Sequence, residues 1–145
     1  MKKILTPFDG SEHSQKAFEK ALEIAEKFES KIIVMTVIQS KVADSSGMSL
    51  DRMQEIQDEE ENSTIAMLKN LEDQANAKNV QMLMEIVHNP SSADGILAFA
   101  NKNDIDLIVM GSHGRTGFKK LVLGSVANKV VGHSKCPVLI TKDTK

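Results

Sequence analysis

Short apolar segments alternate with amphipathic ones along the chain, and this alternation is the clearest guide to its fold. Five segments have the length and apolar content of a buried strand: 3–7, 31–38, 81–87, 106–110 and 137–141. Apolar residues recur at helical spacing in four longer segments, at about 11–28, 51–78, 91–101 and 125–134. Strands that alternate with helices are typical of a parallel sheet with crossover helices on both faces. We therefore predict one α/β domain spanning 1–145, with a doubly wound parallel sheet.

The segment between the second strand and the second helix has a different character. From 39 to 50 the chain is polar and contains Ser45, Ser46 and Gly47, so we expect a mobile loop there. The helix that follows carries four consecutive acids at 58–61. Such a run is typical of a solvent-facing helix surface, and a partner-binding acidic patch is the alternative.

Composition excludes several classes of protein. Aromatic residues make up 3% of the chain and the net charge is −2, which favours neither base stacking nor attraction to a polyphosphate backbone. The single cysteine, Cys136, excludes an internal disulfide and suits a reducing compartment. Only Ile4 and Leu5 separate the basic start from Thr6, too short a stretch for a signal core or a membrane span. We expect a cytoplasmic protein that binds neither nucleic acid nor membrane.

The segment after the fourth predicted strand has the glycine spacing of a phosphate-binding loop. Gly111 and Gly114 are three positions apart, and Gly124 immediately precedes the last predicted helix. Glycines let backbone amides approach an anion, and the first turn of a helix presents N–H groups and the positive end of its dipole. Residues 107–142 carry a charge of +6, which leaves −8 for the rest because the net charge is −2. This distribution favours a local anion site, and the alternative is a tight connection with solubilising lysines.

Asp9 and Gly10 follow the first predicted strand. Ligands of open parallel sheets bind beyond the carboxyl ends of neighbouring strands, here the first and the fourth. A carboxylate at that place can accept hydrogen bonds from the ribose hydroxyls of a nucleotide. Asp9 is therefore the candidate ribose ligand. A cap for the helix that begins at Ser11 is the alternative role, and the two roles need not exclude each other.

These features resemble the universal stress protein family over nearly the whole chain. The opening KKILTPFDGSEHSQKA is similar to the family's first strand and turn. Gly111, Gly114, Gly124 and Ser125 fit the family's nucleotide-binding pattern G-x2-G-x9-G-[ST] without a gap. The resemblance implies a five-stranded sheet of order 3-2-1-4-5, an ATP between the first and fourth strands, and a homodimer through the last strand at 137–141. It also implies Mg2+ or Mn2+ held by the phosphates.

The resemblance assigns site residues by position. Asp9 falls on the ribose-binding acid, Val37 on the backbone contact to adenine, and the glycine pattern on the phosphate contacts. The full set of expected nucleotide-binding residues is Pro7, Asp9, Val37, Met110, Gly111, Ser112, His113, Gly114, Arg115, Gly124, Ser125 and Val126. Thr36 stands where many members carry a histidine and Phe8 where a smaller residue is common, both near the expected base pocket.

The expected function follows from the glycine-rich phosphate-binding segment, called the cradle below, and from the motifs that the sequence lacks. The chain lacks G-x4-G-K-[ST] and G-x-G-x-x-G, which argues against a P-loop ATPase and a dinucleotide-binding oxidoreductase. The four histidines show no metal-ligand spacing, and His113 is the obvious candidate base if ATP is hydrolysed. We expect an ATP-binding sensor or regulator of a stress response. The alternatives are a weak ATPase that uses the same cradle, and a dimeric protein-interaction module with a vestigial nucleotide site.

Overall fold

The computed structural model describes residues 1–39, 47–113 and 123–142. The strands are β1 (Lys3–Pro7), β2 (Lys31–Ile38), β3 (Met82–His88), β4 (Leu107–Gly111) and β5 (Val138–Thr141). The helices are α1 (Glu12–Phe28), α2 (Leu50–Ala77), α3 (Ser92–Lys102) and α4 (Ser125–His133). Every bound lies within one residue of the one expected from the sequence. The expected mobile loop at 39–50 lies mostly outside the described residues.

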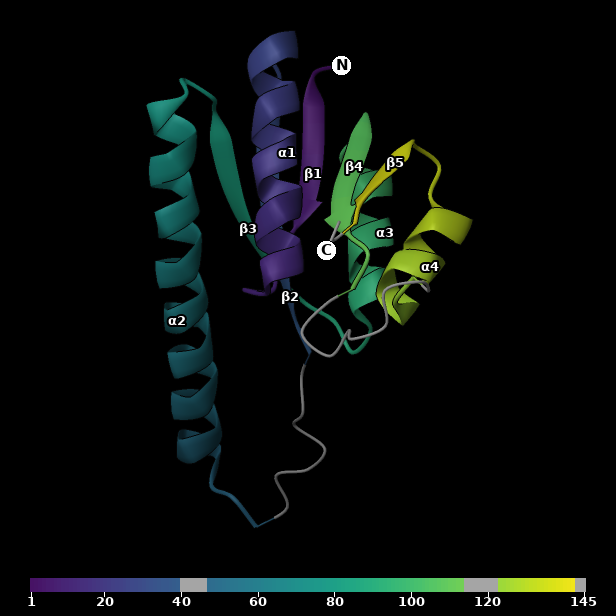
Figure 1. The fold of residues 1–145 in the computed structure, drawn as a ribbon. Coiled ribbons are helices and arrows are strands. Elements are labelled where there is room, and N and C mark those ends of the chain that lie inside the picture. Colours follow the sequence, from purple (N-terminus) through teal and green to yellow (C-terminus); the bar gives the residue numbers. More distant parts are fainter. Residues whose placement is uncertain (40–46, 114–122, 143–145) are drawn as a thin grey trace.

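The strands form one parallel sheet, as predicted. Its order is β3-β2-β1-β4-β5, and each neighbouring pair is parallel (Figure 1). β1 lies in the middle and pairs with β2 on one side and β4 on the other. The strand order reverses between these two neighbours of β1, which makes their carboxyl ends the expected place for a ligand.

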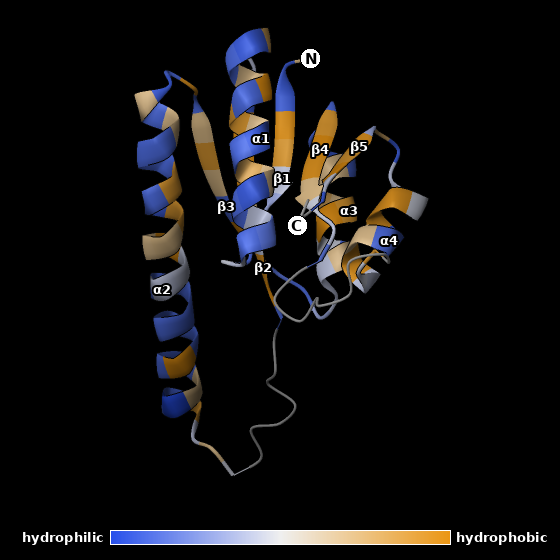
Figure 2. Ribbon diagram, in the orientation of Figure 1, coloured by the Kyte–Doolittle hydropathy of each residue, from blue (hydrophilic) through white to orange (hydrophobic). Residues whose placement is uncertain are grey.

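Two apolar cores fill the space between the sheet and its helices. Successive residues of a strand point to opposite faces, so Ile4 joins the core under α1 and α2 while Leu5 joins the core under α3 and α4. In Figure 2 the strands are mainly orange between helices that carry blue outer faces. This arrangement confirms the α/β fold with helices on both faces of the sheet.

Helix α2 is much longer than the strand it packs against. Its buried residues, Thr64, Leu68, Leu71 and Ala75, all lie in its second half. Figure 1 shows the first half extending beyond the carboxyl ends of the strands. The acids at 58–61 lie in the part of α2 that passes these ends, so the helix forms a wall beside them.

Candidate functional site

A pocket of about 570 Å³ opens at the carboxyl ends of β1, β2 and β4. Its volume lies within the range of about 300 to 1,000 Å³ that small-molecule and cofactor sites occupy. Ten of the residues expected from the sequence line it together: Pro7, Asp9, Val37, Met110, Gly111, Ser112, His113, Gly124, Ser125 and Val126. The other two, Gly114 and Arg115, lie outside the described residues.

The turn from β1 into α1 holds Asp9 at the pocket. The Ser11 N–H donates to Asp9 Oδ1 at 2.9 Å, and Gly10 between them has φ +86°, a conformation that glycine adopts without strain. Ser11 is the cap of α1, because its Oγ accepts from the Ser14 N–H at 3.1 Å. The alternative role of Asp9 as the helix cap is therefore wrong. Asp9 instead closes the turn before the cap and lines the pocket.

The end of β4 and the start of α4 meet closely, and glycines make this possible. A Cβ at Gly111 would lie 2.9 Å from the Cβ and carbonyl oxygen of His13 in α1. A Cβ at Gly124 would lie 3.1 Å from the Ser112 carbonyl oxygen, which already accepts the Gly124 N–H at 2.7 Å. Gly111 therefore lets α1 approach the end of β4, and Gly124 lets the start of α4 approach Ser112, which brings the first turn of α4 against the pocket.

Helix α4 starts without a cap from any side chain in the described part of the chain. Serines cap the three other helices, Ser11 for α1, Ser49 for α2 and Ser91 for α3. The first N–H groups of a helix have no partner inside it, and an anion can accept from them. Because Ser125 and Val126 line the pocket, the amide end of α4 is placed to receive a negatively charged group.

Polar side chains complete this end of the pocket. Ser112 Oγ and His113 Nδ1 lie 3.1 Å apart, and the His113 ring lies 5.5 Å from the His13 ring, centroid to centroid.

An ion pair joins α3 and α4. Lys129 Nζ contacts Asp94 Oδ1 at 2.8 Å, and this hydrogen bond lowers the pKa of the Asp94 carboxyl. No group of three or more His, Cys, Asp or Glu side chains suited to a metal ion occurs within 1–39, 47–113 and 123–142.

The family model described as the universal stress protein family matches residues 1–142. The chain belongs to the universal stress protein family. A universal stress protein from Methanocaldococcus jannaschii is 34% identical over 148 residues, which span 99% of this chain and 84% of that protein. The solved structure of the universal stress protein UspA from Lactobacillus plantarum has a TM-score of 0.83 and 24% identity over 97% of each chain, a likeness in fold. A universal stress protein solved in complex with cAMP has a TM-score of 0.71 and 25% identity, covering 97% of this chain and 96% of that one.

Thr36 and Phe8, the two residues singled out near the expected base pocket, have local structural roles. Thr36 is buried, and its Oγ1 donates to the Phe8 carbonyl oxygen at 2.8 Å. Phe8 is also buried and packs in the core under α1 and α2. Both residues line the pocket, and their hydrogen bond ties the carboxyl ends of β1 and β2 together.

Sequence reasoning missed the part of the pocket that two helices contribute. Glu60, Ser63 and Thr64 of α2 line it on one side, and Ser92 and Ile96 of α3 on another. The buried positions of α2, at 64, 68, 71 and 75, continue backwards at helical spacing to half-buried Glu61, and Glu60 lies beside this inward face. That continuation was the available signal for a pocket wall. Among the described residues, no helix has the length and apolar character needed to cross a membrane.

Proposed function

We propose that this universal stress protein binds an adenine nucleotide, ATP, in the pocket and acts as a nucleotide-dependent sensor or regulator in a stress response. One observation carries the proposal: the pocket joins a carboxylate at the end of β1 to the first turn of α4, which no side chain of the described residues caps. These two features suit the two polar parts of a nucleotide, its ribose hydroxyls and its phosphates. A solved family member in complex with cAMP supports a ligand of this class.

The orientation of the ligand follows from these two features. The phosphates lie at Gly111, Gly124 and Ser125, where backbone amides and a hydroxyl can donate. The ribose lies over Asp9, whose carboxylate accepts from its hydroxyls. The base then reaches Val37 near the carboxyl end of β2, with Pro7 and Met110 beside the ligand and His113 near the phosphates.

A divalent cation enters this proposal with the nucleotide. Mg2+ and Mn2+ prefer oxygen ligands, and Mg2+ is commonly bound through substrate phosphates. The described lining residues hold no cluster of protein metal ligands, so phosphate oxygens supply the coordination. The protein's contribution is to hold these phosphates at the start of α4.

We also propose that two copies associate through β5. This strand is an edge of the sheet, paired with β4 on one side, and its four residues are half-buried. An unpaired strand edge is a template for another strand, and a two-fold copy of the same strand is the simplest cover. Size-exclusion chromatography with light scattering tests this proposal, and a monomeric mass at micromolar protein would contradict it.

Ligand analysis of the purified protein tests the main proposal. Protein prepared without added nucleotide is denatured, the released small molecules are separated by chromatography, and the emptied protein is titrated with ATP and Mg2+ by calorimetry. We expect saturable binding that weakens about 10- to 100-fold in Asp9→Asn, because a hydrogen bond to a charged group contributes about 1.5–3 kcal/mol. The amide keeps an Oδ1 acceptor for the Ser11 N–H, so the hydrogen bond that closes this turn should be retained, and the unfolding temperature is measured to check that the variant folds.

The same experiment separates the alternatives. Phosphate released by the ATP-loaded protein above a blank, and lost in His113→Asn, would favour the weak ATPase. Folded protein that holds no nucleotide and gives no heat with ATP would contradict the proposal. That outcome would favour the interaction module with a vestigial site.

A further inference from the structure

The wall that α2 contributes to the pocket presents hydrogen-bond acceptors. Glu60, Ser63 and Thr64 lie on one face of the helix because residues three and four positions apart are neighbours there. Ser63 Oγ donates to the Glu60 carbonyl oxygen at 3.3 Å, and Thr64 Oγ1 donates to the same oxygen at 2.9 Å. Both hydroxyl protons are therefore used inside the helix, and an ionised carboxylate can only accept. A ligand that meets this wall must bring donors.

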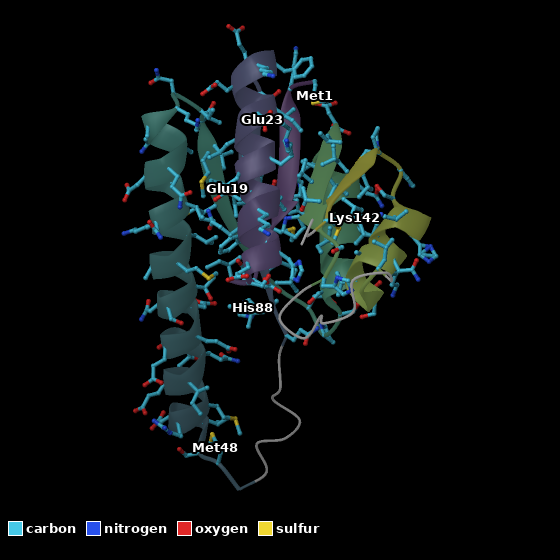
Figure 3. All side chains as sticks on the ribbon, in the orientation of Figure 1. Met1, Glu19, Glu23, Met48, His88 and Lys142 are labelled. Carbon is cyan, nitrogen blue, oxygen red and sulfur yellow. The ribbon has the colours of Figure 1, made fainter. Side chains whose placement is uncertain are left out.

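A hydrogen-bonding contact links this wall to β3 beside the carboxyl end of β2. Glu61 Oε1 contacts His88 Nε2 at 2.7 Å, and His88 is the last residue of β3 (Figure 3). In the sheet His88 is the register partner of Ile38, which also lines the pocket. Glu60, the neighbour of Glu61, is thus held at the β2 side of the pocket, across β1 from the start of α4.

The pocket consequently has two ends of opposite hydrogen-bonding character. The first turn of α4 offers amide donors, and the α2 wall offers carboxylate and hydroxyl oxygens as acceptors. A nucleotide with its phosphates at α4 and its ribose at Asp9 turns its base towards β2 and α2. A base with an exocyclic amine offers the wall a hydrogen-bond donor. A base with a carbonyl oxygen in that place would bring one acceptor against another, and no hydrogen bond could form between them.

We propose that Glu60 is a specificity-determining residue that selects a nucleotide base with an exocyclic amine by accepting a hydrogen bond from it. This inference rests on the proposed function and extends it from the phosphates and ribose to the base. Glu60 is largely exposed at the mouth of the pocket, so water weakens the interaction. Discrimination of about tenfold is the expected size for such a hydrogen bond.

The experiment compares ATP with inosine triphosphate, in which a carbonyl oxygen replaces the adenine amine. Both ligands carry the same ribose and phosphates, so their affinity ratio reports on the base alone. Calorimetry with Mg2+ should give about tenfold preference for ATP in the wild-type protein. In Glu60→Gln the preference should fall to about twofold, since the side-chain amide can donate as well as accept.

Glu59→Gln is the matched control. It makes the same change of charge one position away on α2, at a residue outside the pocket lining. We expect this variant to keep the wild-type ratio, which would exclude a general effect of the acidic run. Equal ratios in Glu60→Gln and Glu59→Gln, with ATP still bound, would overturn the role of Glu60. Failure of folded wild-type protein to bind either nucleotide would instead overturn the proposed function.

Discussion

Two helices begin at the edge of the pocket, and their first turns are completed in opposite ways. At α1 the cap is internal, because Ser11 Oγ accepts the Ser14 N–H and Asp9 accepts the Ser11 N–H. At α4 the residue before the helix is Gly124, which has no side chain to offer, and Ser125 lines the pocket. The start of α1 therefore receives a side-chain cap from its own turn, whereas Gly124 gives α4 none and leaves the first N–H groups of α4 for a ligand.

This difference shows how one fold divides the tasks of a binding site. The β1–α1 turn uses its own hydrogen bonds to hold a carboxylate in place, which suits the recognition of hydroxyl groups. At the end of β4 and the start of α4, Gly111 and Gly124 carry no side chain, so their backbone can reach the pocket, which suits the recognition of phosphate. The two helix starts do not differ in this way if a cap added to α4 leaves nucleotide binding intact, or if removal of the cap of α1 abolishes it.

The largest effect is expected when α4 receives a charged cap. In Gly124→Asp the new carboxylate would accept from the first amides of α4 and repel a phosphate there. Two unit charges about 4 Å apart repel by roughly 4 kcal/mol at an effective dielectric constant of about 20. We expect ATP affinity to fall by at least about 100-fold in calorimetric titration.

Gly124→Asn is the control for this prediction, because it adds a cap of the same shape without the charge. Its Cβ would meet the Ser112 carbonyl oxygen at the same 3.1 Å, so any packing cost is shared by both variants. We expect an intermediate loss of about tenfold, from occupation of the amides alone. If both variants bound ATP as tightly as the wild type, the start of α4 would not be the phosphate site.

A smaller effect, on stability alone, is expected at the start of α1. Ser11→Ala removes the hydroxyl that accepts the Ser14 N–H, and loss of such a cap costs about 1 kcal/mol. The free energy of unfolding in urea should fall by that amount, and Ser11→Thr should restore most of it. ATP affinity should stay within about twofold of the wild type, because Asp9 accepts from a backbone N–H that alanine keeps. A loss of ATP binding as large as that of Gly124→Asp would contradict the division of tasks.

The sequence predicted the parts of the site that follow strands directly. The carboxyl ends of β1 and β4 meet at one end of a parallel sheet in this order, so Asp9 and Gly111 come together from the strand pattern, whereas Val37 was predicted from the family resemblance. Local chemistry also predicted where the helices begin, to within one residue. The role of Asp9 in the turn was less accessible, because Asp9 and Ser11 are both good capping residues and only the backbone conformation distinguishes them.

The α2 wall was harder to predict, since its position depends on tertiary packing. Leu68 and Leu71 anchor the second half of α2 in the core, and this packing decides which face of the first half meets the pocket. The acids at 58–61 look alike in sequence, yet Glu60 lines the pocket and Glu61 pairs with His88. The two interpretations of the acidic run, solvated surface or partner-binding patch, both omitted a role in the pocket.

The smallest predicted effect concerns backbone amides at the amino ends of β1 and β4, at the other end of these strands from the pocket. The N–H groups of Lys2 and Lys3 both donate to Asp106 Oδ2 at 2.9 Å, so a carboxylate of the protein already occupies them, as at α1. These hydrogen bonds lower the pKa of Asp106 from its ordinary value of 3.8. Ionised Asp106 therefore stabilises the fold above that ordinary value, and the contribution is lost as the pH falls through the lowered pKa.

Asp106→Asn should make the protein slightly less stable than the wild type at pH 7, and the difference should shrink as both are acidified below pH 4. The difference should be small because the carboxylate is exposed to solvent, which weakens its hydrogen bonds. Urea unfolding at pH 7, 5 and 3 measures it, and a difference that grows towards low pH would contradict the assigned role. ATP affinity at pH 7 should not change, because amides already paired with a protein carboxylate are not available to a phosphate. A change in affinity would mean that this end of the strands, and not only the start of α4, contributes to nucleotide binding.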